Sequence, residues 1–338
     1  MTMNHGKPVI AVTVGDYNGV GPEVVLKSIR HPDVGRVCVP LLVGPEEVFA
    51  SYARRLGIDI FAHRRRDLAQ AIPGLVDIPV RGSLRIRPGM ISASAGRTAA
   101  RALEVAVAIA SVGLAEGIVT APVSKLAFHR AGVMFPGQTE MVQRLTHSPR
   151  VAMMLVTDRL KVGLATIHIP LSRVPGAITR PGLTERICVI HDALVGDWGI
   201  KKPRIAVLGL NPHAGEGGDI GAEEKRLIVP VVRALQRMGM AVRGPFAADA
   251  FFARYRAGLY DGVIAMYHDQ GLIPLKMSAG GKGVNVSVGL SIVRTSPDHG
   301  TAFDIAGKGV ASPASMIEAI ILAARIAIRR RNQGRKLP

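Results

Sequence analysis

The segment PVIAVTVGDYNGVGPE, residues 8–23, introduces a pattern that repeats along the chain. An apolar, β-branched run leads into a glycine-rich turn, and Pro22 and Glu23 then suit the first turn of a helix, where a carboxylate complements the helix dipole. Backbone amides in such a turn can receive an anion. The segment lacks the spacing of known dinucleotide or phosphate loops, so a tight structural turn is an equally good interpretation.

Strand and helix patterns alternate through the remaining sequence. Apolar runs predict strands at 8–15, 37–44, 116–123, 151–157, 204–210 and 261–267. Helical patterns lie at 22–30, 45–56, 94–113, 137–147, 181–196, 222–239 and 313–329. This alternation indicates an α/β fold with a largely parallel sheet. The runs at 151–157 and 160–168 are separated only by a short turn, so we expect an antiparallel hairpin and a mixed sheet.

Length and composition exclude several classes of protein. With 338 residues the chain exceeds the usual size of a single core, which predicts two domains. Hydrophobic residues make up 48% and aromatic residues only 4%, a balance typical of α/β enzymes. Two cysteines, Cys38 and Cys188, exclude a disulfide framework and favour a reducing, cytoplasmic setting. Neither a secretory signal nor a membrane-spanning stretch is apparent, so we expect a soluble protein.

The formal net charge of +18 raises the question of nucleic-acid binding. The basic residues are densest at 64–66 and 329–336, without aromatic partners or a recognisable binding module. A solvated basic surface explains them better, so no nucleic-acid partner is predicted. Positive charge still favours the approach of anionic substrates.

Three histidines each follow one of the apolar runs: His168 in GLATIHIPL, His213 in AVLGLNPHAGEGG and His268 in VIAMYHDQG. Any one of them could be an ordinary hydrogen-bonded loop residue. Together they predict a divalent-metal site, because three imidazoles leave coordination positions for substrate oxygens and strand ends in open α/β sheets gather ligands. Asp249 and Asp269 are candidates to orient an imidazole or accept a proton, although helix capping is an equal explanation for Asp249.

A set of longer motifs resembles one enzyme family. GDYNGVGPE, TAPVSK, PGQTEM, LATIHIPL, LNPHAGEGG, AMYHDQGLIPLK, GVNVSVGL and RTSPDHGTAFDIAGKG have the order and spacing seen in the 4-hydroxythreonine-4-phosphate dehydrogenases of vitamin B6 biosynthesis. The resemblance implies a two-domain, isocitrate and isopropylmalate dehydrogenase-like α/β fold, with mixed, mostly parallel sheets and the active site in the cleft between domains. It places a cofactor domain at 1–122 plus 295–338 and a metal and dimer domain at 123–294. It also implies a homodimer with the metal site at the subunit interface.

The resemblance extends to individual residues. The family's metal ligands match His168, His213 and His268, and its substrate-binding residues match Thr139, Lys276, Asn285 and Arg294. Lys276 and Arg294 would bring positive charge to a phosphorylated ligand, and Lys276 and Asn285 flank a glycine-rich segment that we expect to be mobile.

One position departs from the family pattern. A histidine usually precedes the threonine, whereas this chain has Gln138. Glutamine forms hydrogen bonds but carries no charge and shuttles no proton near neutral pH. The change is either a tolerated variant or the mark of a different substrate. Relatives oxidise threonate or erythronate 4-phosphate, and others act on aromatic dihydrodiols.

The reaction implied by the resemblance is an NAD-linked oxidation of 4-phosphooxy-L-threonine to 2-amino-3-oxo-4-phosphooxybutanoate, which decarboxylates to 3-amino-2-oxopropyl phosphate in pyridoxal 5'-phosphate biosynthesis. A divalent ion such as Zn, Co or Mg would assist by binding the substrate alcohol. From the chemistry alone, a metal-dependent lyase or hydrolase is the alternative class, because an open three-histidine site can also activate water.

The cofactor prediction rests on SPDHGTAFDIAGKG, which resembles the loop that binds the adenosine half of the cofactor in decarboxylating hydroxy-acid dehydrogenases. This gives His299, Gly300 and Thr301 as candidate cofactor residues. No arginine pair stands in the loop, so NAD is preferred to NADP, a preference that a basic residue elsewhere in the fold could reverse.

Overall fold

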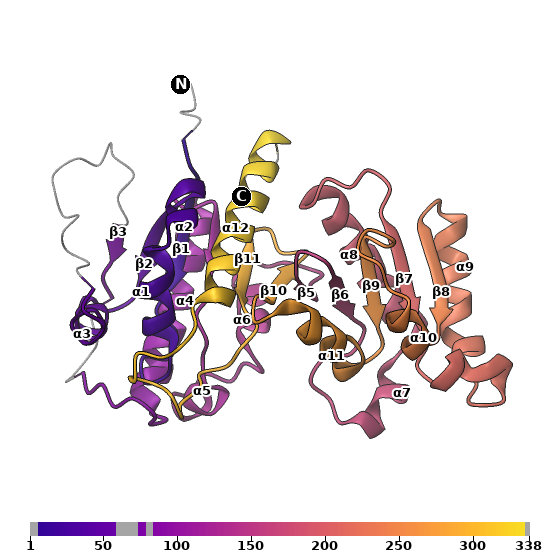
Figure 1. Cartoon of the computed structure of the whole chain (residues 1–338), viewed down its shortest axis with the longest axis horizontal. Coiled ribbons are helices and arrows are strands. Elements are labelled where there is room, and N and C mark those ends of the chain that lie inside the picture. The colour runs from indigo at the N-terminus through magenta and orange to yellow at the C-terminus, as the bar shows by residue number, and fades with distance from the viewer. Residues whose placement is uncertain (1–5, 59–73, 79–83, 335–338) are drawn as a thin grey trace. The chain divides into compact units, whose positions relative to one another are not determined.

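The computed structural model describes residues 6–58, 74–78 and 84–334, and the chain divides into two compact units (Figure 1). Unit 1 comprises Met1–Pro149 and Leu290–Pro338, and unit 2 comprises Arg150–Gly289. The sequence had placed residues 123–149 with the second unit. They fall in unit 1 because their helices pack against a long helix of that unit. The basic residues at 64–66 and at 335–336 lie outside the described residues.

Unit 1 is built on parallel strands. Their order is β3 (Gly74–Val76), β2 (Val39–Val43), β1 (Val9–Thr13), β4 (Gly117–Val119) and β11 (Arg294–Pro297). Each neighbouring pair in this order is parallel. Nearly every residue of β1 is buried, as expected for a parallel strand with helices on both faces.

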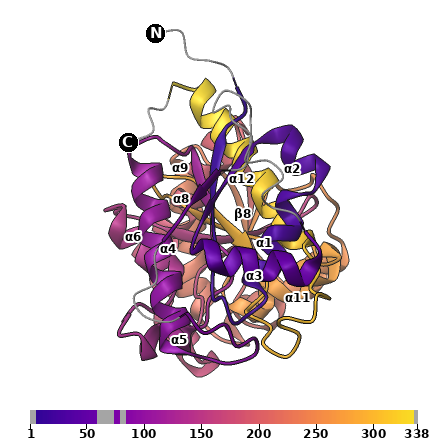
Figure 2. The ribbon, with the colours of Figure 1, turned by 90° about the vertical axis from the view of Figure 1, so that its left-hand side faces the viewer.

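The helices of unit 1 confirm the predicted alternation. They are α1 (Gly21–Ile29), α2 (Pro32–Val37), α3 (Glu46–Leu56), α4 (Ala93–Ser111), α5 (Lys125–Arg130), α6 (Gln138–Leu145) and α12 (Ala314–Asn332). Helix α4 covers one side of the strands, and α1 and α12 cover the other (Figure 2). Both α5 and α6 pack against α4, which explains the unit boundary.

Unit 2 has a mixed set of strands, as predicted. Their order is β10 (Val284–Val288), β5 (Ala152–Val156), β6 (Lys161–Leu164), β9 (Gly262–Ala265), β7 (Arg204–Leu208) and β8 (Ala241–Phe246). Strand β5 pairs antiparallel with both β10 and β6, and the remaining neighbours are parallel. The hairpin predicted from residues 151–168 is therefore confirmed, although β6 already ends at Leu164.

Helices cover both faces of these strands. They are α7 (Val174–Ala177), α8 (Arg180–Gly196), α9 (Val229–Arg237), α10 (Ala248–Ala253) and α11 (His268–Ala279). Val162 lies against α11 and its neighbour Gly163 lies against α8. Because successive residues of a strand point to opposite faces, α8 and α11 lie on opposite sides of β6. Apolar residues of α11, including Leu272 and Leu275, complete the core on their side.

The predicted ranges omit several elements of the structure, among them the strands β3, β8, β10 and β11 and the helices α2, α5, α7 and α11. Strand β8 contains Gly244 and Pro245, and α11 contains Gly271 and Pro274, residues with low propensity for a strand or helix interior. The packing of both elements against the core overrides these local preferences. No described helix is long and apolar enough to cross a membrane.

We predict that Gly96→Ala destabilises unit 1 by about 1–3 kcal/mol, because overpacking must displace backbone. A Cβ at position 96 would lie against the carbonyl group of Ala127, well inside the 3.0 Å that real Cβ contacts essentially never breach. Urea unfolding measures the change. The control is Gly35→Ala in α2, where a Cβ would have no heavy atom within 4 Å and should be neutral or slightly stabilising. Equal effects of the two substitutions would contradict the close packing of α4 and α5.

Candidate active site

The three predicted metal-ligating histidines follow neighbouring strands of unit 2. His168 comes after β6, His268 after β9 and His213 after β7. These strands are adjacent in the order β6-β9-β7 and run parallel, so their carboxyl ends lie at one edge of the sheet. The fold therefore brings all three chain segments to the edge at which ligands bind in α/β proteins.

Two of the three imidazoles lie close together. The ring centroids of His168 and His268 are 5.5 Å apart, at an interplanar angle of 43°. Nδ1 of His268 lies 2.7 Å from Oδ1 of Asp269, as expected if this carboxylate orients the ring. An Nδ1–H donated to Asp269 leaves the lone pair on Nε2 of His268 available to a cation.

His213 lies in a turn of unusual geometry. It belongs to η2 (Pro212–Gly218), in which the residues from His213 to Gly217 all have positive φ. Within the described parts of a single chain, no three histidine, cysteine, aspartate or glutamate side chains lie close enough together to hold a metal ion. One chain thus supplies the His168–His268 pair without a third ligand from this set.

A buried glutamate, which the sequence did not single out, holds the His213 turn. Oε1 of Glu224 accepts hydrogen bonds from the amides of Leu210 and Asn211, at 2.7 and 2.8 Å, and Oε2 accepts from the Asn211 side chain. Gly215 allows the turn to pass directly over this carboxylate, since a Cβ there would be 2.6 Å from Oε2. The signal in the sequence was a pair of glutamates, Glu223 and Glu224, shortly after the glycine-rich turn.

Gln270 connects the His213 segment to the start of α11. Its Nε2 donates to the Gly209 carbonyl at 2.7 Å, and its Oε1 accepts from the Met266 amide at 2.7 Å. The side chain therefore bridges the ends of β7 and β9, two residues from His268. Asp249 is exposed in the first turn of α10, where a carboxylate complements the helix dipole, and α10 packs against η2.

Arg294 forms the centre of a second group of predicted residues, which lies in unit 1. Its Nη2 donates to Thr120 at 2.7 Å and to Oε1 of Gln138 at 3.4 Å, and its Nη1 donates to Thr139 at 3.3 Å. Gln138 also donates from Nε2 to the Ala121 carbonyl at 3.0 Å. The structure thus brings Arg294, Gln138 and Thr139 together, and adds Thr120, which the sequence did not indicate.

This guanidinium group is a buried positive charge. Arg294 is only 3% exposed, and burial lowers its pKa to about 10, opposed by the negative charge of Glu140. At neutral pH the group is still charged. Charge-assisted hydrogen bonds are stronger than neutral ones, so an anionic ligand that reached this guanidinium group would gain a strong interaction.

Lys276 and Asn285 lie in unit 2 and differ in character. Lys276 is exposed in the last turn of α11, which ends at Gly280 in the left-handed conformation. Asn285 lies in β10, and its Oδ1 is buried without a hydrogen-bond partner among the described residues. The segment expected to be a mobile loop is therefore largely a helix end and a strand. The unsatisfied Asn285 oxygen is suited to a ligand hydroxyl or ammonium group.

The predicted cofactor residues lie in unit 1 on the loop before α12. The Thr301 carbonyl accepts from the Val20 amide at 2.9 Å, so Thr301 is anchored to the turn at residues 15–20. His299 faces the Gly300 carbonyl with Nδ1, and its Nε2 is buried without a partner among the described residues. A Cβ on Gly300 would have no heavy atom within 4 Å, so the backbone there is open to close approach.

A basic residue outside this loop lies beside it. Nη1 of Arg55, at the end of α3, is 3.5 Å from the position that a Cβ on Gly307 would occupy. Arg55 could not be singled out from the sequence, because it is distant from this loop along the chain. Its position bears on the choice between NAD and NADP.

The GDYNGVGPE turn has a structural role. The Asn18 side chain accepts from the Arg87 amide at 2.7 Å and donates to the Met90 carbonyl at 2.8 Å, which fixes the approach to α4. Asp16 is fully buried, and desolvation raises its pKa to about 6 although its Oδ1 accepts from the Asn18 amide. These contacts support the interpretation as a tight structural turn.

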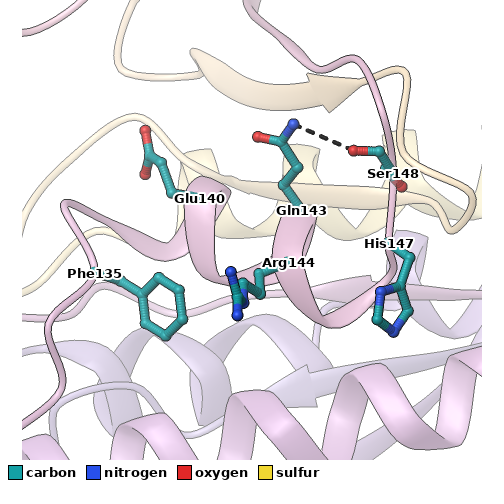
Figure 3. Close-up of a pocket in the computed structure, with 6 residues that line it drawn as sticks. All are labelled: Phe135, Glu140, Gln143, Arg144, His147 and Ser148. Carbon is teal, nitrogen blue, oxygen red and sulfur yellow. Dashed lines mark hydrogen bonds between the residues drawn. The ribbon is translucent and has the colours of Figure 1, made fainter.

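An open pocket of about 480 Å³ lies on α6. Figure 3 shows its lining residues, Phe135, Glu140, Gln143, Arg144, His147 and Ser148. Gln143 donates to the Ser148 carbonyl at 3.2 Å, and the positive and negative side chains in the lining are mixed. None of the predicted site residues lines this pocket, although Gln138 and Thr139 begin the same helix.

Known proteins of one family are similar to this chain over most of its length. Residues 36–323 match the family described as pyridoxal phosphate biosynthetic protein PdxA. A 4-hydroxythreonine-4-phosphate dehydrogenase of Aromatoleum aromaticum is 45% identical, over 94% of this chain and 95% of its own. A D-threonate 4-phosphate dehydrogenase of Cupriavidus necator is 43% identical, over 96% and 98%.

Similarity in structure extends over the same length. A crystal structure of 4-hydroxythreonine-4-phosphate dehydrogenase from Klebsiella pneumoniae has a TM-score of 0.82 at 40% identity, covering 95% of this chain and 100% of the other. These matches, together with the family's motifs at the strand ends, show that the chain belongs to the pyridoxal phosphate biosynthetic protein PdxA family.

Proposed function

We propose that the protein is a metal-dependent, NAD-linked dehydrogenase that oxidises 4-phosphooxy-L-threonine. The 2-amino-3-oxo-4-phosphooxybutanoate formed would decarboxylate to 3-amino-2-oxopropyl phosphate, a precursor of pyridoxal 5'-phosphate. The observation that carries this proposal is the His168–His268 pair, with Asp269 behind it, at the carboxyl end of neighbouring strands. The names of the full-length relatives support the same activity.

The donor set suits a divalent ion such as Zn, Co or Mg. The two imidazoles at 5.5 Å offer nitrogen ligands, and the Asp269 contact favours the tautomer in which Nε2 of His268 can coordinate. When bound, the cation supplies Lewis-acid stabilisation of the alcohol oxygen as it loses its proton, and the nicotinamide supplies the acceptor for hydride.

The protein's own side chains bind and orient the substrate in this proposal. Arg294 offers a fixed positive charge to an anionic group of the substrate, and the hydroxyls of Thr120 and Thr139 hold the guanidinium in place. The unsatisfied oxygen of Asn285 accepts a hydrogen bond from a hydroxyl or ammonium group. Lys276, which is exposed, adds a second positive charge.

The metal site requires a second copy of the chain in this proposal. We propose a homodimer in which His213 and His268 of one site come from different subunits. Apolar side chains are exposed in the segments that follow the three histidines along the chain, as an unpaired interface would require. They are Ile169, Leu171, Ile220, Ile273 and Met277, of which Met277 is 83% exposed.

The cofactor proposed is NAD, with NADP as the competitor. Asp304 is exposed in the loop that carries His299, Gly300 and Thr301, and a carboxylate there suits ribose hydroxyls and repels a 2'-phosphate. The positive charge of Arg55, which lies beside Gly307, would instead attract the 2'-phosphate of NADP. Both cysteines are unpaired thiols, which is consistent with the cytoplasmic location that we propose.

A second candidate is a dehydrogenase of D-threonate 4-phosphate. It is favoured by the similarity to the Cupriavidus necator enzyme of that name and by glutamine at position 138. 4-Phosphooxy-L-threonine bears an ammonium group next to its carboxylate, whereas D-threonate 4-phosphate bears a hydroxyl group there. Asn285 could accept a hydrogen bond from either group.

We predict that the protein reduces NAD in the presence of 4-phosphooxy-L-threonine and a divalent ion, with kcat/KM at least about tenfold higher than for D-threonate 4-phosphate. Absorbance of the reduced nicotinamide and release of carbon dioxide are measured together, with NADP and an aromatic dihydrodiol as comparison compounds. A preference for the threonate would establish the second candidate instead. Turnover without any nicotinamide would indicate a lyase or hydrolase.

The shared metal site predicts complementation between inactive variants. His213→Ala and His268→Ala should each lack activity and lose Co²⁺ binding, followed by its visible absorption. Unfolding and refolding the two together should restore about a quarter of the wild-type activity, because half of the random dimers are mixed and each mixed dimer has one intact site. Each variant refolded alone is the control. Mixed dimers that form without regaining activity would refute a site shared between subunits.

Gln138→His should introduce a pH dependence into anion binding. A histidine gains a proton below about pH 6.5 and would add positive charge beside Arg294, so sulfate should inhibit the variant about three- to tenfold more strongly at pH 5.5 than at pH 8. Sulfate keeps the same charge across this range. The inhibition constant of the wild-type protein should change much less. If the inhibition constant of sulfate changes equally with pH in both proteins, position 138 does not act on the anion.

A further inference from the structure

A partly buried ion pair contacts the loop that carries the predicted cofactor residues. Glu23, in the first turn of α1, is fully buried. Its Oε1 accepts from the Ala311 amide at 2.8 Å and its Oε2 accepts from the Gly309 amide at 3.3 Å. The sequence explained Glu23 only by the helix dipole, whereas its carboxylate binds backbone almost three hundred positions away along the chain.

Lys27, one turn further along α1, completes the arrangement. Its Nζ donates to Oε1 of Glu23 at 2.8 Å and to the carbonyls of Gly309 and Ala311, each at 2.8 Å. The backbone amides and carbonyls of Gly309 and Ala311 are therefore all hydrogen-bonded to the Glu23–Lys27 ion pair. Hydrogen bonds to charged groups are stronger than neutral ones, and a buried carboxylate deprived of them is costly.

The other end of the loop is also fastened. The Thr301 carbonyl accepts from the Val20 amide, and the Asp298 amide donates to Ser315 at 2.9 Å. Between these attachments, Asp304 and Lys308 are exposed, whereas Ala306 is buried. The loop is thus held at both ends, and side chains between them are open to a ligand.

We propose that Glu23 and Lys27 are positioning residues that hold the loop at 298–311 in the shape that accepts the nicotinamide cofactor. The identity of the ligand rests on the function proposed above. Neither side chain need touch the cofactor. Their effect is to order the loop before binding, so that the ligand does not bear the entropic cost of ordering it.

The test uses the full-length protein with Glu23→Gln, which keeps the shape of the side chain and removes its charge. Two measurements are made: the Kd of NADH, and the rate at which trypsin cleaves after Lys308, followed by mass spectrometry. We expect the Kd of NADH and the KM of NAD to rise about tenfold, with a much smaller change in kcat and in the KM of the phosphorylated substrate. Cleavage after Lys308 should accelerate, and NADH should slow it in both proteins.

Glu116→Gln is the matched control. Glu116 forms an ion pair with Arg331 at 3.2 Å in the same unit, away from the loop, so its removal should lower stability without changing the Kd of NADH. If the wild-type protein binds NADH and Glu23→Gln changes neither the Kd nor the cleavage after Lys308, the positioning role is refuted. The same holds if Glu116→Gln weakens NADH binding equally. A wild-type protein that binds no nicotinamide would refute the proposed function itself.

Discussion

The parallel pairing of β6, β9 and β7 is the constraint on which the candidate site depends. Parallel neighbours end at the same edge of a sheet, so residues that follow them meet however far apart they lie in sequence. His168 and His268 lie about a hundred residues apart in the chain, yet their rings are 5.5 Å apart. The antiparallel hairpin of β5 and β6 matters for the same reason, because it sets the direction in which β6 enters this group.

Two buried glutamates give the loops around this framework a fixed shape. Glu224 accepts backbone amides of the turn that carries His213, and Glu23 accepts backbone amides of the loop before α12. Both are fully or almost fully buried. A carboxylate satisfied by several donors is stable in such a position, whereas its removal would leave backbone amides without partners. Glycines allow the chain to approach closely, as Gly215 does over Glu224.

The sequence predicted the periodic elements and the chemistry-bearing residues better than the contacts between them. Apolar runs identified strands such as β1, β7 and β9, and the short turn after residue 157 identified the hairpin. Helix α11 was missed because Gly271 and Pro274 interrupt its local pattern, and tertiary packing decides its conformation. The roles of Glu224 and Arg55 could not be predicted, because each depends on a partner brought close only by the fold.

Gln138 shows how a departure from a family pattern can preserve geometry while changing electrostatics. Its amide accepts a hydrogen bond from Arg294 and donates one to the Ala121 carbonyl. A neutral histidine, with one acceptor and one donor nitrogen, has the same two capacities. Glutamine therefore reproduces the uncharged form of the residue that it replaces and lacks only the charged form. The buried charge of Arg294 then remains the constant electrostatic feature of this group, because its hydrogen bond to position 138 needs only an acceptor and not a charge.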